Sequence, residues 1–470
     1  MNFASYDFWK LLFLCFVGSR LILAAAARFC PRLTDTAAKL CLLATALILM
    51  GSESWLTLVA FLFVVLLGWA TLLLQSSSLP RVPKNILFVL LLAAQLAPLI
   101  YYKYWNFLIN ETLGLDMRNP SVLIPMGLSF YTFQTIGFWV DNIRSPSPRP
   151  TFLDYLNFSS FFPQIVAGPI EKRDDLLPQI QSHRFRIHPE NMDAALRWIV
   201  LGLAYKMVVA DNLGLLPEKF QIDPSNAFHV WLESLTFGMR IYFDFAGYSF
   251  IAIGLGLIFG VSLTLNFRCP YWSANLRDFW RNWHITLGAW LRDYIYMPLG
   301  GRKKGRWILN TLIVFLVSGI WHGAGWGFII WGLLHGIGVA LCASPKAEKK
   351  LPWPVRWIAT FLYTTAAWLF FMESDPALLR EKALGLINPL SYGLEQINAI
   401  PAVFARQLDA VTFALILGIA FIALLAEGLG LRKNREPYHF GRARFVSALL
   451  VFLIVFLAPM EESRFIYFNF

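Results

Sequence analysis

The residues best suited to chemistry lie in one apolar stretch, Thr311 to Gly336, which reads TLIVFLVSGIWHGAGWGFIIWGLLHG. His322 stands beside Trp321 in a run of glycines, and His335 lies near the end of the stretch. Ionisable residues are rare within membrane segments, and those that occur there usually have a function. A neutral imidazole with space beside it and apolar walls around it suits proton transfer near neutral pH. We therefore predict His322 as a general base, with Trp321 as a supporting neighbour.

The glycines around His322 are compatible with two structures. Glycine lets a neighbouring backbone or a ligand approach closely, or it lets a helix break where it lines a cavity. Two roles also stay open for His335: a core histidine bonded to a neighbouring helix, or a group that positions or polarises the substrate. Asp244 follows Arg240 by four residues. We interpret this pair as a buried ion pair that braces the bundle, with Asp244 only a possible supporting residue of the site.

A second stretch, Asn275 to Gly301, carries aromatic residues at helical spacing and polar residues on the opposite stripe, among them Arg277, Arg281, His284 and Arg292. This pattern predicts one amphipathic helix. Its basic face is either a solvated face at the membrane surface or one wall of a cytoplasmic mouth for a phosphate-bearing donor. Planar guanidinium groups bind phosphate through two bonds. We therefore assign Arg277, Arg281 and Arg302 to donor binding.

The composition places these residues in a membrane protein. Of 470 residues, 57% are hydrophobic and 15% are charged, whereas soluble proteins contain about 25% charged residues. Twelve apolar segments predict membrane helices, one or two of them re-entrant. They are Phe8–Ala27, Ala37–Met50, Trp55–Leu74, Ile86–Tyr102, Val122–Val140, Leu196–Val209, Trp231–Phe259, Ile308–Ile320, Gly327–Cys342, Trp357–Phe371, Val411–Leu429 and Val446–Pro459.

The basic loops predict an orientation. The net charge is +11, and the clusters of Lys and Arg all fall on one side if the segments simply alternate. This indicates that the basic loops lie in the cytoplasm and that both termini lie outside. The partner of these charges is then the lipid bilayer and not nucleic acid. The apolar segment Phe158–Ile170 is too short to span and contains helix-breaking Pro163, Gly168 and Pro169. We predict that it is re-entrant or interfacial and, if it lies at depth, buried in protein.

The sequence lacks the motifs of several classes of enzyme and binding protein. The five cysteines form no CxxC pair or Cys/His metal spacing, and no GxSxG, HExxH, P-loop or GxGxxG sequence occurs. We expect neither a metal nor a permanently bound cofactor, and neither a hydrolase nor a nucleotide-binding protein. A proton-coupled transporter with His322 and His335 as a relay is an alternative. It predicts broken helices in two repeated halves, and no such repeat is evident.

Five stretches resemble the membrane-bound O-acyltransferase (MBOAT) family, in the bacterial branch of the alginate O-acetyltransferase membrane subunit. They cover roughly the central half of the chain in family order: FYTFQTIGFWVD (130–141), NFSSFFPQIVAGPI (157–170), IYFDFAGYS (241–249), FWRNWHITLGAWLRDYIYMPLGG (279–301) and SGIWHGAGWGFIIWGLLHG (318–336). We accordingly expect a single domain over 1–470. It would have N-terminal helices over 1–118, a catalytic core over 119–343 and C-terminal helices over 344–470.

The resemblance implies an all-α polytopic bundle of about 11–12 transmembrane helices, with re-entrant and amphipathic segments around a central funnel. The catalytic histidine of the family falls on His322, and its second polar position falls on His284. Either His284 or His335 could polarise the thioester carbonyl or position the donor, and the sequence does not choose between them. The implied activity passes an acetyl group from a cytoplasmic thioester, acetyl-CoA, across the inner membrane. A periplasmic or membrane-anchored acceptor protein of an exopolysaccharide machinery would receive it. Alginate is the expected polymer, with cellulose next. D-alanyl transfer and peptidoglycan acetylation are alternatives that use similar membrane subunits.

Overall fold

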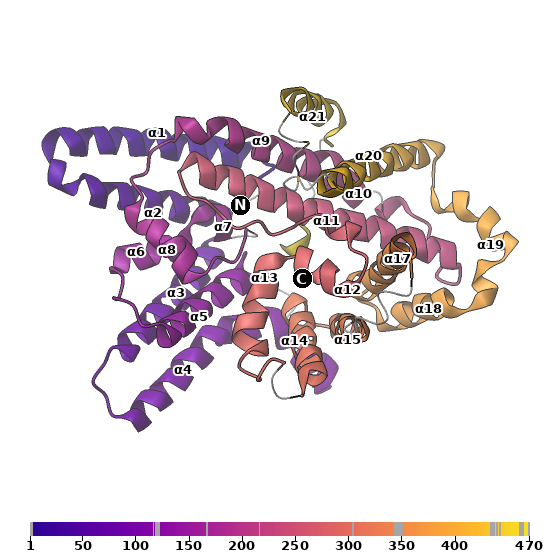
Figure 1. Cartoon of the computed structure of the whole chain (residues 1–470), viewed down its shortest axis with the longest axis horizontal. Helices are drawn as coiled ribbons and strands as arrows, with labels where there is room; N and C mark the ends of the chain where they lie inside the picture. The colour runs from indigo at the N-terminus through magenta and orange to yellow at the C-terminus, as the bar shows by residue number, and fades with distance from the viewer. Residues whose placement is uncertain are drawn as a thin grey trace. The chain divides into compact units, whose positions relative to one another are not determined.

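The structure is a computed structural model that describes residues 3–115, 117, 123–165, 168–215, 217–302, 305–342, 351–432, 438, 440, 443–459 and 465–468. Figure 1 shows that helices make up nearly all of the regular structure in these residues. An isolated antiparallel bridge pairs Phe220 with Phe404 and belongs to no strand. The predicted all-α fold is confirmed.

Eight helical segments within the described residues are long and apolar enough to cross a membrane. They involve α1 (Tyr6–Phe29), α2 (Thr34–Glu53), α3 (Trp55–Gln75), α4 (Arg81–Leu99), α9 (Met192–Leu203) with α10 (Asp211–Leu215), α11 (Ala227–Ile258), α17 (Trp353–Met372) and α20 (Gln407–Arg432). Three shorter apolar helices are α14 (Trp307–His322), α15 (Trp326–Leu341) and α21 (Arg444–Leu457). The protein is therefore a multi-pass membrane protein.

Eleven of the twelve predicted membrane segments coincide with these helices. The twelfth, Val122–Val140, corresponds in part to α5 (Leu128–Arg144). This helix begins later than predicted because Gly127 adopts a left-handed conformation, with φ of +72°, which ends helical continuity toward Pro125. Val122 lies outside the described residues.

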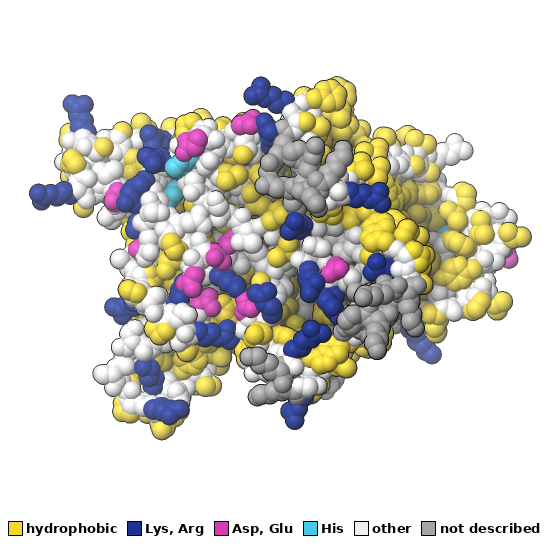
Figure 2. All heavy atoms as spheres, viewed as in Figure 1, with side chains coloured by type: hydrophobic (Ala, Val, Ile, Leu, Met, Phe, Trp, Pro, Cys, Tyr) yellow, Lys and Arg dark blue, Asp and Glu magenta, His cyan; other side chains and the backbone are white. Residues whose placement is uncertain are grey.

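Large apolar side chains face outward along the long helices. Leu21 of α1 is 69% exposed, and Ile422 of α20 is 69% exposed. Figure 2 shows apolar side chains gathered over α20 and α21. A helix that is apolar on all sides is typical of a membrane span. These surfaces are therefore expected to face lipid.

The chain forms two compact units. The first comprises Met1–Ile199, Tyr248–Thr264 and Tyr467–Asn469, and the second comprises Val200–Gly247, Leu265–Ile466 and Phe470. Helix α11 contributes residues to both units. All the predicted site residues belong to the second unit, which also contains α12 (Leu276–Asn282), α13 (Ile285–Leu291), α18 (Pro376–Ile387) and α19 (Leu394–Asn398).

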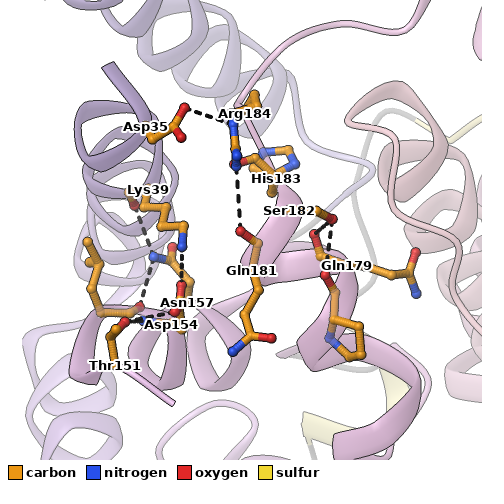
Figure 3. A network of polar contacts seen from close by, with 12 residues as sticks. Asp35, Lys39, Thr151, Asp154, Asn157, Gln179, Gln181, Ser182, His183 and Arg184 are labelled. Atoms are coloured by element: carbon orange, nitrogen blue, oxygen red, sulfur yellow. Dashed lines mark hydrogen bonds and ion pairs between the residues drawn. The ribbon is translucent and has the colours of Figure 1, made fainter. Parts of the chain in front are cut away.

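Polar contacts connect two basic loops in the first unit (Figure 3). Lys39 of α2 forms an ion pair with Asp154 of α6 (Phe152–Ser160) at 2.5 Å. Arg184, which follows α8 (Arg173–Ser182), pairs with Asp35 of α2 at 2.8 Å. The loop before α2 and the loop after α8 therefore lie together. This agrees with the prediction that both basic clusters face the same side of the membrane.

The predicted re-entrant segment Phe158–Ile170 is irregular and buried. Helix α6 ends within it, and α7 (Phe162–Ile165) is a single short helix. Phe161 and Phe162 are both 0% exposed. Two of its residues, Val166 and Ala167, lie outside the described residues. The described part is thus surrounded by protein, as an irregular backbone at membrane depth requires.

Helices α14 and α15 form a hairpin whose backbones touch. A Cβ atom on Gly319 would lie 2.3 Å from the Phe328 carbonyl oxygen, and one on Gly332 would lie 2.4 Å from the Phe315 carbonyl oxygen. Close approach through small residues is the usual way in which membrane helices pack. The glycine-rich stretch therefore provides both predicted features, a backbone contact and a helix break between His322 and Trp326.

The length of the hairpin predicts that its turn lies at an intermediate depth in the membrane. Each of its two helices has 16 residues, which corresponds to about 24 Å at the α-helical rise. The hydrocarbon core of a bilayer is about 30 Å thick. A hairpin that begins near one membrane surface would therefore reverse before it reaches the other surface, with His322 at its turn.

We predict that Gly332→Val destabilises the hairpin, because its side chain would collide with a backbone carbonyl that cannot rotate away. Overpacking of this kind costs about 1–3 kcal/mol or more. Thermal unfolding of the purified protein in detergent, followed by tryptophan fluorescence, should show a lower midpoint. Gly418→Val in α20 is the matched control, since nothing lies within 4 Å of a Cβ at Gly418. Equal midpoints for the two variants would contradict the glycine contact.

Candidate active site

The predicted single helix over Asn275 to Gly301 is wrong. The structure has two short helices, α12 and α13, with a break at Trp283 and His284. His284 has a left-handed backbone with φ of +44°, a conformation that costs a non-glycine residue roughly 1–2 kcal/mol. Such an outlier persists only when its surroundings impose it, and it is found preferentially at functional sites.

An extended segment before α12 holds the break in place. Arg268 donates its backbone N–H to the carbonyl of Asn282 at 2.9 Å, and Ile285 donates its backbone N–H to the carbonyl of Asn266 at 2.9 Å. A helix break in a buried region leaves backbone donors and acceptors that need partners. The segment 266–268 supplies them on both sides of His284. The chain therefore ends α12 and begins α13 without burying unsatisfied backbone groups at these two positions.

A cavity of about 480 Å³ runs along α13. Three arginines and His284 line it together with apolar side chains. The full lining is Arg277, Trp280, Arg281, His284, Ile285, Leu287, Gly288, Ala289, Leu291, Arg292, Tyr296, Thr311, Val314, Phe315, Ser318 and Val339. The structure thus brings two of the predicted donor-binding residues together with the second predicted histidine.

Arg302, the third predicted donor-binding residue, is not among the residues that line the cavity. Its guanidinium group lies 6.0 Å from the centre of the Trp307 ring. The cavity instead contains Arg292, which sequence reasoning placed on the polar stripe without assigning it to donor binding. Arg292 follows Gly288 by four residues and comes directly after α13, so both lie on the same exposed side. This spacing is the sequence signal that could have assigned Arg292 to the cavity.

Two of the three arginines at the cavity form ion pairs with neighbouring aspartates. Arg281 contacts Asp278 at 3.1 Å, and Arg292 contacts Asp293 through two hydrogen bonds of 2.7 and 3.1 Å. Both arginines are more than half exposed. Solvent-exposed pairs of this kind contribute little to stability. Either guanidinium group can therefore exchange its carboxylate for an anionic ligand at small cost.

His284 is buried at the wall of the cavity. It is 1% exposed, and its Nδ1 lies 3.1 Å from Oδ1 of Asn266. The Phe245 ring packs against its edge with a centroid distance of 4.6 Å. Burial lowers the pKa of His284 to about 3, because a desolvated imidazolium is disfavoured. The side chain is therefore neutral at any pH at which the protein is expected to work.

His322 is the last residue of α14 and is 2% exposed. Its ring is 6.5 Å from the His284 ring, centroid to centroid. Aromatic rings surround it: Trp321 at 4.9 Å, Trp331 at 5.1 Å and Phe371 at 5.3 Å. His322 is not among the residues that line the cavity. His284 thus both lines the cavity and neighbours His322.

His335 is packed behind Trp280. It is 0% exposed, and its Nδ1 accepts a hydrogen bond from the Trp280 indole N–H at 3.2 Å. It also lies nearly parallel to the Phe279 ring, at 6.3 Å. This geometry agrees with the interpretation of His335 as a core histidine. Because Trp280 lines the cavity, His335 also has an indirect route by which to position a substrate.

The predicted ion pair between Asp244 and Arg240 is wrong. Asp244 pairs with Lys206 at 3.0 Å, and Lys206 also pairs with Asp211 at 2.7 Å. The backbone N–H of Ile466 donates to Asp244 at 2.8 Å. All three charged side chains are almost fully buried. Asp244 is not among the residues that line the cavity, so it braces the helices, as predicted, with a different partner.

The polar and loop contexts of the remaining histidines, His183, His188, His229 and His439, predict that they lie at the surface. His183 and His229 are instead buried, with 6% and 3% exposure. Burial lowers the pKa of His183 to about 4. His188 is partly exposed and pairs with a glutamate of its own loop. His439 lies outside the described residues.

Comparisons with known proteins identify the family of the chain. The model of the membrane-bound O-acyltransferase family matches residues 142–374, which include α12 to α15 and therefore both His284 and His322. Peptidoglycan O-acetyltransferase of Helicobacter pylori is 31% identical over 83% of this chain and 84% of its own length. The probable alginate O-acetylase of Pseudomonas putida is 33% identical over 78% of this chain and 77% of its own length.

A third relative has a different acyl group in its name. Teichoic acid D-alanyltransferase of Streptococcus thermophilus is 31% identical over 49% of this chain and 59% of its own length. All three names describe acyl transfer, which leaves the transporter alternative without support. The identity and coverage of the first two relatives place the chain in the family that the site geometry indicates. The protein belongs to the membrane-bound O-acyltransferase family and is a multi-pass membrane acyltransferase.

Proposed function

We propose that the protein transfers an acetyl group from a cytoplasmic thioester, acetyl-CoA, to an acceptor on the other side of the inner membrane for O-acetylation of a polysaccharide. One observation carries this proposal. His284 lines the arginine-walled cavity, and its ring lies 6.5 Å from the ring of His322. The cavity therefore has arginines that suit a phosphate-bearing donor. At its wall, His284 is one of two neighbouring buried imidazoles.

The cavity suits a donor with a charged head and an apolar arm. Its volume of about 480 Å³ lies within the range of small-molecule sites, about 300–1,000 Å³. Arg281 and Arg292 are exposed at its wall and can bind phosphate through two bonds each. Leu287, Val314 and Phe315 supply an apolar lining. Phosphates at the arginines would leave the acyl end of the donor toward His284.

His322 acts as the general base in this proposal. It takes the proton of the acceptor hydroxyl as the hydroxyl oxygen attacks the thioester carbonyl carbon. The new carbon–oxygen bond forms, the carbon–sulfur bond breaks, and the sulfur leaves as a thiolate that recovers a proton. The Trp321, Trp331 and Phe371 rings around His322 exclude water. Exclusion of water protects the thioester from hydrolysis and strengthens the electrostatic contacts of the site.

The polysaccharide is inferred from the relatives. One is named as an O-acetyltransferase of peptidoglycan and another as a probable O-acetylase of alginate, and both match most of this chain. We propose alginate as the acceptor polymer, with cellulose as a close alternative. An acceptor protein outside the membrane would complete the transfer. Peptidoglycan is a second candidate, because the Helicobacter pylori relative matches the larger share of this chain.

We expect the basic loops to lie in the cytoplasm, because Lys and Arg next to membrane helices are retained on that side. Reporter fusions after Lys84, Lys304 and Arg435 should give a cytoplasmic signal. A fusion at the C-terminus, or one inserted at Ser54 between α2 and α3, should give an outer signal. Lys304 and Arg435 lie outside the described residues. A periplasmic signal at Lys304 would reverse the orientation and remove cytoplasmic donor access.

Replacement of Arg277 and Arg281 with Gln should raise the apparent KM for acetyl-CoA by about 10-fold, because charge-assisted hydrogen bonds to phosphate are lost. Arg302→Gln is the matched control, since Arg302 is not among the lining residues and should change KM little. Expression and membrane insertion should be normal for all variants. An unchanged KM in the double variant would mean that this face is only a membrane-surface face.

His322→Ala should reduce acetyl transfer by about 10²–10⁴-fold, the usual contribution of a general base. His322→Gln should fail as well, because an amide can form hydrogen bonds but cannot take a proton. His335→Gln should retain activity if His335 only packs against Trp280. Transfer of labelled acetyl from acetyl-CoA by purified protein measures all three. Normal turnover in a folded His322→Ala protein would exclude this mechanism.

A further inference from the structure

Asn266 lies directly against the broken helix, in the extended segment before α12. It is 0% exposed. Its backbone carbonyl accepts the N–H of Ile285 at 2.9 Å. Its side-chain Oδ1 accepts the backbone N–H of Thr286 at 3.2 Å and the Thr286 hydroxyl at 3.0 Å. The same Oδ1 lies 3.1 Å from Nδ1 of His284. One amide oxygen therefore joins the start of α13 to the candidate site histidine.

The orientation of this amide follows from its partners. The oxygen and nitrogen of an asparagine side chain are distinguished by their hydrogen bonds, not by their shape. The Thr286 backbone N–H can only donate, so the Asn266 atom that faces it must be the oxygen. A flipped amide would bring two N–H groups together in a buried place, which costs the desolvation of both.

The protonation of His284 follows in turn. Its Nδ1 faces the Asn266 oxygen, which has no hydrogen to give. Nδ1 must therefore carry the ring proton. His284 is neutral for the reason given above, and a neutral imidazole has only one N–H. Its Nε2 is then the ring nitrogen with a lone pair. The hydrogen bond made by one ring nitrogen thus determines the chemistry of the other.

We propose that Asn266 is a positioning residue that keeps His284 in the Nδ1–H tautomer, so that Nε2 serves the acyl-transfer site as an acceptor for a substrate O–H or N–H. This inference rests on the proposed function. It selects between two roles that the sequence leaves open for His284. An Nε2 without hydrogen cannot donate to the thioester carbonyl and cannot polarise it. It can orient the attacking hydroxyl or an amide N–H of the donor.

The charges near His284 favour the same neutral form. The charged residues among those that line its cavity are Arg277, Arg281 and Arg292. Cations oppose protonation of a neighbouring imidazole. From α14 the titratable neighbour is His322, and from α11 the neighbour is the apolar Phe245. The hydrogen bond to the Asn266 oxygen selects which ring nitrogen of His284 keeps the proton.

The tautomer can be measured without any turnover. Protein labelled with ¹⁵N-histidine gives separate nitrogen signals for protonated and unprotonated ring nitrogens, and His284→Gln identifies the His284 signals by subtraction. We expect a protonated Nδ1 and an unprotonated Nε2 in the wild type. Asn266→Leu, which removes the acceptor, should allow the Nε2–H tautomer to appear. A wild-type His284 with a protonated Nε2 would overturn the proposal.

Kinetics test the consequence for catalysis. Asn266→Leu should lower kcat for acetyl transfer by at least about 10-fold, as loss of a group that orients a catalytic-site imidazole commonly does, with a smaller change in KM. Asn266→Asp keeps the acceptor oxygen and adds a negative charge that stabilises imidazolium. It should keep most of the activity at high pH and lose it as the pH falls, because protonated Nε2 is no longer an acceptor.

Thr286→Val is the matched control. It removes one hydroxyl from the Asn266 oxygen but keeps the Thr286 backbone N–H and the His284 bond. Its kcat should lie within about threefold of the wild type, because a single neutral hydrogen bond contributes little. A flat pH profile for a folded Asn266→Asp protein, equal to that of the wild type, would contradict the role of Asn266.

The two proposals fail in different ways. If the wild type transfers no acetyl group but shows the expected tautomer, the proposed donor or acceptor is wrong and the assignment of the ring proton stands. If the wild type is active and Asn266→Leu keeps both the Nδ1–H tautomer and the wild-type kcat, the proposed function stands and the positioning role is excluded.

Discussion

Contact between two helix backbones determines the position of the candidate catalytic histidine. Gly319 and Gly332 allow α14 and α15 to approach until a carbonyl of each helix occupies the space where a Cβ of the other would stand. In lipid, helices gain nothing from leaving water, so close van der Waals contact is a main source of association. The approach brings Trp331 of α15 over the ring of His322 at the end of α14. The part of the aromatic surroundings of His322 that α15 supplies depends on this contact.

Burial then decides the chemical state of the polar residues. His284 loses its charge because burial disfavours the imidazolium form, and a neutral ring needs one acceptor and one donor at the correct nitrogens. Asn266 and Trp280 fill such roles for His284 and His335. Lys206 is placed differently, between two carboxylates. Buried charges are tolerated when they are paired. Removal of one partner would leave an uncompensated buried charge and destabilise the fold.

The error over the amphipathic stretch shows a limit of periodicity. Aromatic residues on both sides of His284 follow one helical pattern, because α12 and α13 bury similar faces against the core. The pattern reports which side chains are buried, and it does not report whether the backbone between them remains helical. The groups that replace the helical hydrogen bonds come from Asn266 and Arg268. Neither residue lies within the stretch, so the sequence of the stretch alone could not predict the helix break.

By itself the sequence determined the membrane class, most of the helices, the apolar and glycine-rich setting of His322 and the basic stretch over 275–301. These features depend on composition, on long apolar runs and on local spacing, all of which survive without knowledge of distant contacts. Only the tertiary structure decided that Asp244 pairs with Lys206, that Arg292 and not Arg302 joins the cavity, and that His284 sits at a helix break. Each of these is a pairing between residues from separate elements. Local pattern cannot predict it, because buried polar groups take whichever partner the packing of the helices brings within hydrogen-bond distance.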